Sequence, residues 1–294
     1  MKISFLGIGL MGAPMVNNLL NAGFKLSLWN RSLEKMLPYK DRAELHESVT
    51  SAIAGADMVI TMLETGQVVD SVLYSSQAYK SLKAGTLVID MSSIPPSLAR
   101  LHAGKVSEQA ALYLDAPVSG GTRGASEATL SIMVGGAHEA FNRAQPVFNA
   151  LGRATRIGDV GCGQVCKLAN QAIVGITIGA VSEALLLASE NGADLEAVHQ
   201  ALSGGFAAST ILEQHGKRML TRNFQPGATS RVQLKDLQTI LDEARLSNLN
   251  LPLAQRTFEL YRSLVANGHE AVDHSGLLLE LEHINQTTLM HKQK

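Results

Sequence analysis

The sequence has few of the residues that mark several classes of protein. Its two cysteines, Cys162 and Cys166, lie one helical turn apart and could supply at most half of a metal site. No nearby cysteine or histidine pair completes such a site, so we interpret both as reduced core residues and expect no metal. The 25 lysines and arginines are balanced by 26 aspartates and glutamates and form no basic block. A nucleic-acid partner is therefore not expected.

The sequence also predicts neither a signal peptide nor a membrane span. The chain starts directly with a strand-like run, so we expect a cytoplasmic protein. The apolar stretch over residues 172–187 is interrupted by Glu183 and preceded by Lys167, Asn170 and Gln171. A bilayer requires an uninterrupted span of about twenty apolar residues. We therefore expect no membrane partner and interpret the stretch as a helix buried between domains.

The chain has 294 residues, of which 46% are apolar, and a net charge of -1. This length and composition predict a globular protein of about two domains. The predicted strands cover residues 2–6, 25–29, 57–62, 86–91, 112–115, 130–134 and 155–157. Helical patterns replace them afterwards, over residues 163–190, 195–202, 232–246, 252–266 and 274–286. The sequence predicts an α/β fold: an N-terminal Rossmann-type doubly wound sheet in residues 1–161, then an all-α domain in residues 162–294.

Residues 5–15 read FLGIGLMGAPM and contain the pattern G-x-G-x-x-G. The pattern alone is a weak signal, but here it stands between a predicted strand and a predicted helix, which is the context of a dinucleotide site. There Gly7 makes the turn, Gly9 lets the backbone approach a pyrophosphate, and Gly12 allows close packing of helix on sheet. A glycine turn without a ligand is the alternative. The predicted cofactor-binding loop consists of Gly7, Ile8, Gly9, Leu10, Met11 and Gly12.

The end of the second predicted strand bears on the choice of cofactor. A site selective for NAD usually places an acidic residue about twenty residues beyond the glycines, where it binds the ribose. This chain has Asn30, Arg31 and Ser32 there. An uncharged amide, a guanidinium and a hydroxyl suit an additional phosphate, so we predict that NADP(H) is preferred over NAD(H). The alternative is that Arg31 is a solvated loop residue.

Four motifs, in order, resemble those of the β-hydroxyacid dehydrogenases, and the resemblance covers essentially the whole chain. They are FLGIGLMGAPM (5–15), DAPVSGG (115–121), GQVCKLANQ (163–171) and KDL (235–237). One departure is Glu64, where the family usually has proline, which leaves the shape of that loop open. GGFAAS (204–209) and DHS (273–275) add a resemblance to the tartronate semialdehyde reductase branch. The 3-hydroxyisobutyrate dehydrogenase and glyoxylate/succinic semialdehyde reductase branches are the alternatives.

Lys167 is the predicted general acid. Reducing an aldehyde requires a hydride at carbon and a proton at oxygen. Lys167 lies early in an otherwise apolar helix, where partial burial favours release of its proton. A surface lysine that extends to solvent is the alternative. Asn170 shares its helical face, and Asn170 and Gln171 are predicted to bind the substrate or orient the lysine.

A second group of predicted binding residues lies in loops. Ser119, Gly120 and Gly121 follow a short strand, and a hydroxyl with unshielded backbone N–H groups can hold a substrate carboxylate. A tight turn is the alternative. The family resemblance further implies cofactor contacts from Met62, Leu63, Ser92, Ser93 and, from the helical domain, Lys235. Asp236 is expected either to pair with a neighbouring base or to be solvated.

Together these features predict an NAD(P)-dependent oxidoreductase that interconverts a small carboxylate-bearing aldehyde and its hydroxy acid. Tartronate semialdehyde and D-glycerate are the pair that the resemblance favours, and the family is commonly dimeric or tetrameric, so we expect a homodimer or homotetramer that packs through its helices. A nucleotide-binding protein that has lost catalysis is the alternative. Lys167 argues against it, because losing the acid would be the simplest route to inactivity.

Overall fold

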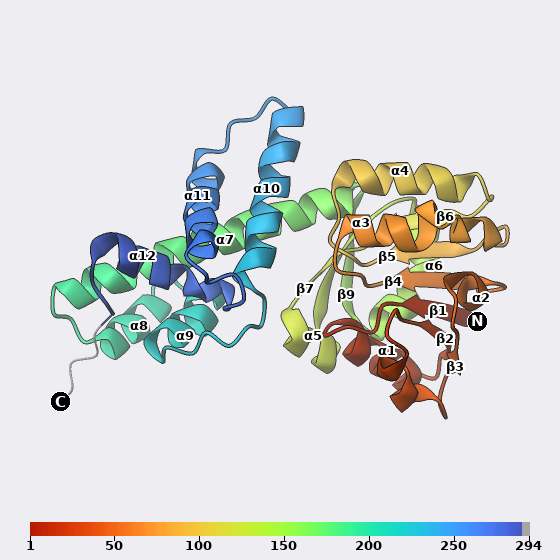
Figure 1. Cartoon of the computed structure of the whole chain (residues 1–294), viewed down its shortest axis with the longest axis horizontal. Coiled ribbons are helices and arrows are strands. Elements are labelled where there is room, and N and C mark those ends of the chain that lie inside the picture. The colour runs from red at the N-terminus through yellow and green to blue at the C-terminus, as the bar shows by residue number, and fades with distance from the viewer. Residues whose placement is uncertain (290–294) are drawn as a thin grey trace. The chain divides into compact units, whose positions relative to one another are not determined.

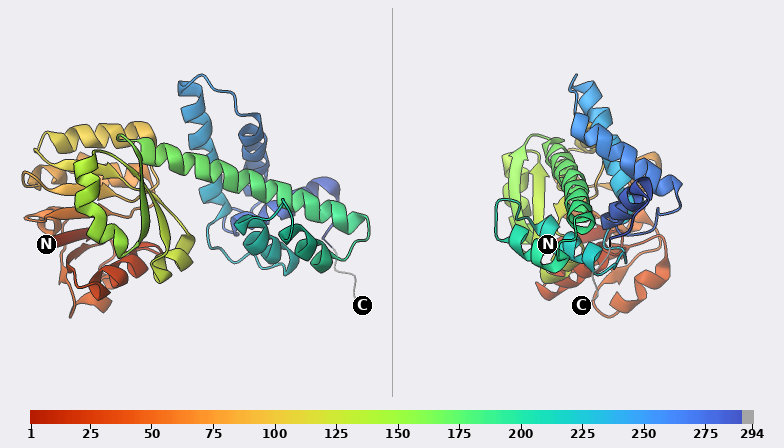
Figure 2. Two further views of the ribbon diagram at one scale, coloured as in Figure 1. Left: turned by 180° about the vertical axis from the view of Figure 1, so that it is seen from behind. Right: turned by 90° about the vertical axis from the view of Figure 1, so that its left-hand side faces the viewer.

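The computed structural model describes residues 1–289 and divides the chain into two compact units, Met1–Lys167 and the part from Leu168 onward (Figure 1). Residues 290–294 of the predicted helical domain lie outside the described residues. The predicted domain boundary after residue 161 falls just before helix α7 (Cys162–Glu190). This helix is uninterrupted and passes from the first unit into the second (Figure 2).

The strands of the first unit form one sheet in the order β3-β2-β1-β4-β5-β6-β8-β7, with β9 paired to β8. The parallel strands are β1 (Lys2–Leu6), β2 (Lys25–Trp29), β3 (Glu44–Leu45), β4 (Met58–Thr61), β5 (Leu87–Asp90) and β6 (Leu112–Asp115). The other strands are β7 (Val118–Ser119), β8 (Leu130–Gly135), which runs antiparallel to β6 and β7, and β9 (Gly152–Gly158). The order reverses between β1 and β4, and the carboxyl ends of strands at such a point are where ligands bind in open α/β sheets.

Helices cover both faces of this sheet because its strands are apolar on both sides. Along β1, Ile3 and Phe5 belong to one buried cluster, whereas Leu6 belongs to another on the opposite face. The first cluster includes residues of α1 (Gly12–Asn21), α5 (Gly121–Glu127) and α6 (His138–Asn149). The second includes residues of α2 (Val49–Ile53), α3 (Gly66–Val69) and α4 (Pro96–Ser107). The predicted doubly wound sheet is confirmed.

The described part of the second unit is built from helices. After α7 come α8 (Leu195–Ser203), α9 (Lys217–Leu220), α10 (Ser230–Leu246), α11 (Pro252–Ala266) and α12 (Leu277–Asn285). Short π- or 3₁₀-helical turns complete the chain at Leu33–Lys35, Leu37–Tyr39, Asp70–Ser75, Ala78–Ser81, Leu212–Gly216 and His274–Gly276. The helix predicted over 274–286 begins with the 3₁₀ turn His274–Gly276, and the Asp273 carboxylate caps that turn by accepting the backbone N–H of Ser275 at 3.0 Å.

Helix α7 is the one helix of residues 1–289 that is long and apolar enough to cross a membrane. This is weak evidence, because the core helix of a soluble protein meets the same criterion. Ile178 and Leu185 of α7 are fully buried in the core of the second unit, and Glu183 lies between them. These contacts favour the interpretation of α7 as a core helix.

Both cysteines lie in the first turns of α7. Their thiols are free, as predicted. The prediction that they are core residues is wrong, because both side chains are half-buried on a helix whose buried face they do not share.

Candidate active site

The glycine-rich loop has a shape that side chains would prevent. Gly7 has a φ of 106°, and a Cβ there would lie 2.3 Å from the carbonyl oxygen of Met62. A Cβ on Gly12, the first residue of α1, would lie 2.0 Å from the carbonyl oxygen of Gly7. Gly9 is exposed, and no atom lies within 4 Å of the position that its Cβ would take. The loop thus leaves open space beside its backbone, which fits a dinucleotide whose pyrophosphate lies close to the main chain.

Asn30 supports this loop from within the protein. Its Oδ1 accepts the backbone N–H of Ile8 at 2.8 Å, and its Nδ2 donates to the carbonyl of Ser32 at 3.0 Å. The amide is therefore engaged in shaping the loop. Arg31 beside it is exposed and Ser32 is half-buried, so these two carry the accessible polar groups at the end of β2.

The loops after β4 and β5 are tied to each other. The backbone N–H of Leu63 donates to the Ser92 hydroxyl at 3.0 Å, and the backbone N–H of Ser92 donates to Asp90 at 3.0 Å. Asp90 also accepts the hydroxyl of Thr61 at 2.7 Å, and burial raises the pKa of its carboxyl to about 6. Ser92 has no exposed surface and its hydroxyl holds these loops, and its predicted contact with the cofactor stays a prediction. Among the residues predicted here, Met62, Leu63 and Ser93 are half-buried and accessible.

The start of α7 is anchored to the first unit by a buried carboxylate that the sequence did not single out. Asp115, at the end of β6, accepts the backbone N–H of Gly161 at 2.7 Å and that of Gln164 at 2.8 Å. Burial raises the pKa of this carboxyl, and the two N–H groups oppose the shift. The buried Gln164 side chain in turn donates to the carbonyl of Ser92 at 2.8 Å. In the sequence, Asp115 closes an apolar strand and opens the DAPVSGG motif, but it was assigned no role of its own.

Lys167, Asn170 and Gln171 lie on one continuous helix. Lys167 is half-buried on α7, the last residue of the first unit. Asn170 and Gln171 follow three and four positions later, so the three side chains share a helical face. The Asn170 amide donates to Oε1 of Gln171 at 2.9 Å. The predicted general acid thus lies next to two amide side chains that can bind a polar substrate.

Helix α10 holds the side chain of Gln171. Gln171 Nε2 donates to Asp236 at 2.6 Å, and Lys235 Nζ lies 3.0 Å from the other carboxylate oxygen of Asp236. Asp236 is buried, so of the two expectations for this residue pairing with a neighbouring base is confirmed. Lys235 itself is half-buried.

The predicted carboxylate-binding loop follows β7. Ser119 is half-buried, and Gly120 and Gly121 are exposed with φ of 132° and 61°. A backbone in this region favours glycine and leaves the N–H groups unshielded. No atom lies within 4 Å of the Cβ position of Gly121, so the loop has room for a bound anion.

One cluster of metal-ligand types lies outside these predicted sites. His215, Asp273 and His274 have ligand atoms within 4.8 Å of one another. However, Asp273 already accepts the backbone N–H and the hydroxyl of Ser275, at 3.0 and 2.7 Å, and Arg218 Nη1 lies 3.7 Å from it. A carboxylate used in this way beside a guanidinium does not favour a metal ion.

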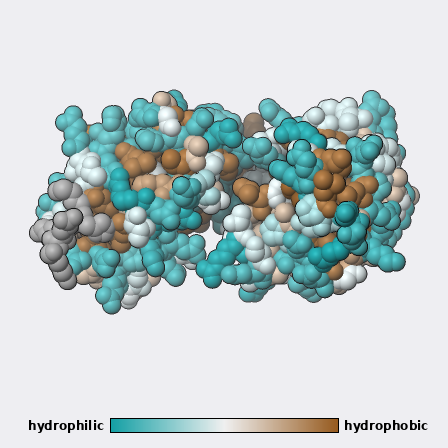
Figure 3. Space-filling model, turned by 60° about the horizontal axis from the view of Figure 1, so that its bottom comes forward, coloured by the Kyte–Doolittle hydropathy of each residue, from teal (hydrophilic) through white to brown (hydrophobic). Residues whose placement is uncertain are grey.

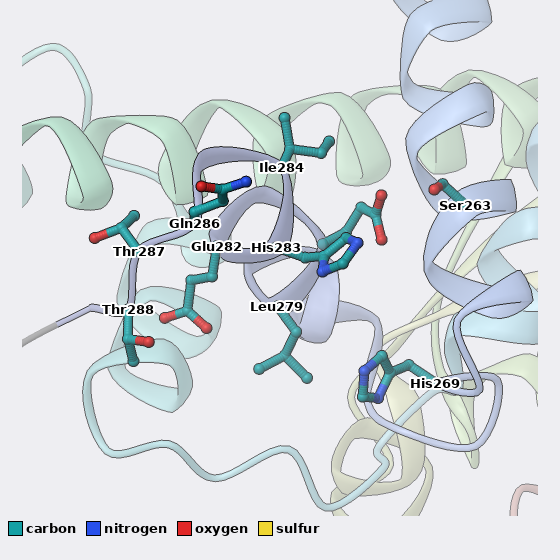
Figure 4. Close-up of a pocket in the computed structure, with 10 residues that line it drawn as sticks. Ser263, His269, Leu279, Glu282, His283, Ile284, Gln286, Thr287 and Thr288 are labelled. Carbon is teal, nitrogen blue, oxygen red and sulfur yellow. The ribbon is translucent and has the colours of Figure 1, made fainter.

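A hollow on the second unit contains none of the predicted residues (Figure 4). Its lining includes Glu280 and Glu282 of α12. Glu280 accepts the amide of Asn267 at 2.8 Å, and Glu282 is paired with Arg222 at 3.0 Å. These acidic groups serve the packing of the unit, and we assign the hollow no role in catalysis.

The two units correspond to two known families of domain. Residues 2–163 match the family described as the NAD binding domain of 6-phosphogluconate dehydrogenase. Residues 161–281 match the family described as NAD-binding of NADP-dependent 3-hydroxyisobutyrate dehydrogenase. With the strand order and the glycine loop, these matches define an NAD(P)-dependent dehydrogenase with a Rossmann domain.

Named relatives narrow this class. The chain is 43% identical to 2-hydroxy-3-oxopropionate reductase of Escherichia coli (strain K12) over 289 residues, which cover 96% of this chain and 97% of that one. It is 35% identical to 3-hydroxyisobutyrate dehydrogenase of Pseudomonas aeruginosa, covering 94% and 96% of the two chains. The solved structure of Mycobacterium tuberculosis 3-hydroxyisobutyrate dehydrogenase with L-serine superposes with a TM-score of 0.87 at 30% identity, covering 95% and 98%. The chain belongs to the 3-hydroxyisobutyrate dehydrogenase family, the NAD(P)-dependent β-hydroxyacid dehydrogenases.

Proposed function

We propose that this protein reduces tartronate semialdehyde (2-hydroxy-3-oxopropionate) to D-glycerate with NADPH, and that Lys167 is the general acid. The observation that carries the proposal is the placement of Lys167 beside Asn170 and Gln171 on α7, a helix whose start is fixed by Asp115. The 43% identity to a 2-hydroxy-3-oxopropionate reductase supports the choice of substrate.

The chain's own residues account for binding and proton transfer. When bound, the nicotinamide supplies the hydride that reduces the carbonyl carbon. Lys167 Nζ gives its proton to the carbonyl oxygen, which becomes the new hydroxyl, and the neutral amine then takes a proton from water. Asn170 and Gln171 hydrogen-bond the substrate beside that oxygen, and Ser119 with the N–H groups of the following glycines holds the carboxylate.

The preference for NADP(H) follows from the end of β2. Asn30 is engaged by the glycine loop, whereas Arg31 is exposed and no carboxylate occupies the adjacent position. An exposed guanidinium binds a phosphate group bidentately, whereas a carboxylate would repel it. We propose that Arg31 and Ser32 bind the 2′-phosphate of NADPH.

A panel of aldehydes with both cofactors tests the proposed function. The oxidation of NADPH is followed with tartronate semialdehyde, methylmalonate semialdehyde, succinic semialdehyde and glyoxylate, and the values of kcat/KM are compared. The largest value is expected for tartronate semialdehyde. A larger kcat/KM for methylmalonate semialdehyde would instead indicate a 3-hydroxyisobutyrate dehydrogenase. A larger kcat/KM for succinic semialdehyde or glyoxylate would indicate a glyoxylate/succinic semialdehyde reductase. Tight cofactor binding without turnover of any aldehyde would favour a catalytically silent protein.

We also propose that the protein is a cytoplasmic homodimer or homotetramer. Two large apolar side chains of α7 support this: Ile173 is 66% exposed and Leu187 is 69% exposed. Figure 3 shows hydrophobic surface on both units. Light scattering after gel filtration should give two or four times the chain mass, and Ile173→Asp should lower it. A monomeric wild-type protein, or recovery in the membrane fraction of cells, would contradict this proposal.

A further inference from the structure

A buried amide connects α10 to the face of α7 that carries the predicted substrate-binding residues. Gln233, on α10, is only 1% exposed and packs against Gly175 of α7. A Cβ on Gly175 would lie 2.6 Å from Nε2 of Gln233, so the glycine is what allows the amide to approach. Nε2 donates to the backbone carbonyl of Gln171 at 3.1 Å.

The other end of this amide faces a pair of histidines. Gln233 Oε1 lies 3.4 Å from Nδ1 of His274. Because an amide oxygen only accepts hydrogen bonds, the geometry assigns the proton of this contact to His274 Nδ1. Nε2 of His274 then accepts from Nε2 of His215, 3.3 Å away, and Nδ1 of His215 lies 3.5 Å from Asp273. A polar chain therefore runs from His215 through His274 and Gln233 to the backbone of Gln171.

We infer that Gln233 is a positioning residue, which fixes the Asn170–Gln171 turn of α7 through this polar chain and so sets the geometry of substrate binding. The inference rests on the proposed function. Gln171 is held at both ends by α10, its carbonyl by Gln233 and its side chain by Asp236. Burying an amide is costly unless both of its ends are hydrogen-bonded, whereas a leucine would fill a similar volume without that requirement.

Four variants separate positioning from packing. Gln233→Leu keeps the volume and removes both contacts, and Gly175→Ala pushes the amide away while favouring the helix. Gly179→Ala, one turn further along α7, is the matched control, because its Cβ would lie 3.6 Å from Leu277, an ordinary contact. Gln233→Leu and Gly175→Ala should each lose about fivefold in kcat/KM for the aldehyde, since one hydrogen bond is worth about 1 kcal/mol. Gly179→Ala should match the wild type, and all three should bind NADPH normally.

The fourth variant, Gln233→Glu, gives a readout that packing alone would not move. Its protonated carboxyl can still donate to the Gln171 carbonyl, whereas the ionised form presents an acceptor to an acceptor. The ionisable groups around this position are Lys235 and Asp236 on α10, His274 and Asp273 before α12, and His215 and Arg218 on the preceding helical segments. The kcat/KM of Gln233→Glu should therefore fall as pH rises through the pKa of the introduced carboxyl, on top of the wild-type profile.

These experiments distinguish a failure of the positioning role of Gln233 from a failure of the proposed function. If the wild type turns over and Gln233→Leu and Gly175→Ala have the kcat/KM of Gly179→Ala, the positioning role is wrong, whatever their melting temperatures. If the wild type turns over no aldehyde, the proposed function fails, and amide hydrogen exchange over residues 167–175 then tests positioning by itself. Faster exchange in Gln233→Leu and Gly175→Ala than in Gly179→Ala supports the inference, and equal exchange overturns it.

Discussion

The two units of this protein form their functional groups in different ways. In the first unit the predicted binding surfaces are largely backbone: the loop from Gly7 to Gly12 and the turn at Gly120 and Gly121. In the second unit they are side chains held by other side chains, as Asp236 and Gln233 hold Gln171. Backbone sites require glycine at fixed spacing, so they leave a pattern in the sequence. Side-chain networks between helices leave almost none, since their members are far apart in the chain.

Cofactor binding and proton donation come from different parts of the molecule. The first unit is suited to hold an anionic cofactor, because backbone N–H groups near a helix N-terminus attract phosphate. Lys167 supplies the one predicted proton donor, at the point where α7 leaves the first unit. Loss of the loop groups of the first unit should therefore change cofactor and carboxylate recognition, whereas loss of Lys167, the last residue of that unit, should change the rate of the chemical step.

The largest expected effect is that of Lys167→Ala. General acid catalysis contributes roughly 10²- to 10⁴-fold, so kcat should fall by about that factor, while the Kd for NADPH, measured by fluorescence, stays normal. Lys167→Arg should do little better, because guanidinium is too weak an acid to release its proton. A near-normal kcat in either variant would mean that Lys167 is not the acid, and Lys235 would be tested next.

The next effect concerns stability and compares buried histidines of the two units. Burial lowers the pKa of His102, in α4, and of His274 to about 4, from 6.5. Since the folded state favours the neutral ring, this contribution to stability is full above pH 6.5 and is lost as pH falls toward 4. For His102 the loss between pH 7 and pH 5 should be about 2 kcal/mol, measured by urea unfolding.

The matched variant for this measurement is His102→Phe. The His102 ring stacks on Tyr74 with centroids 3.9 Å apart, and phenylalanine preserves that contact. Between pH 7 and pH 5 the free energy of unfolding should fall less in this variant than in the wild type. The part of the fall that is due to His274 should remain. An unchanged pH dependence would show that His102 is not the neutral, buried group that its geometry describes.

A smaller effect is expected at the carboxylate-binding loop. Hydrogen bonds to a charged group are worth about 1.5–3 kcal/mol, so aldehydes with a carboxylate should exceed neutral aldehydes of equal length by about ten- to a hundredfold in kcat/KM. Ser119→Ala should narrow this ratio, whereas Ser126→Ala, at an exposed serine of α5, should not. Equal use of charged and neutral aldehydes by the wild type would show that the loop is only a turn.

The smallest effect is expected at Arg31. Loss of its contact with the 2′-phosphate should reduce the preference for NADPH over NADH in kcat/KM by about tenfold or less, given the exposure of the side chain. Lys35→Ala removes an exposed basic residue nearby and serves as the control. Equal efficiency of the wild type with both cofactors would remove the basis of this assignment.

Much of the fold was predictable because it follows from local pattern. Strands such as Met58–Thr61 are nearly continuous apolar runs and are buried at every position, which indicates a sheet covered on both faces. The long helical patterns after Gly161 indicate the second unit. The 3₁₀ turn His274–Gly276 at the start of the last predicted helix, which the single side chain of Asp273 caps, was missed. Helix and strand existence follows from periodicity, whereas such ends depend on single hydrogen bonds.

The sequence by itself determined the class of protein. The glycines at positions 7, 9 and 12, and the motif around Lys167, each consist of residues close together in the chain, so they can be recognised without the structure. Only the tertiary structure decided which polar residues are accessible and which are buried in hydrogen bonds within the protein. Ser92 was predicted to touch the cofactor, yet it is buried and holds the Leu63 loop. Gln233 carried no signal, yet it is bonded to a residue 62 positions away. The physical reason is that a hydrogen bond between distant segments depends on how strands and helices pack, and no local pattern contains that information.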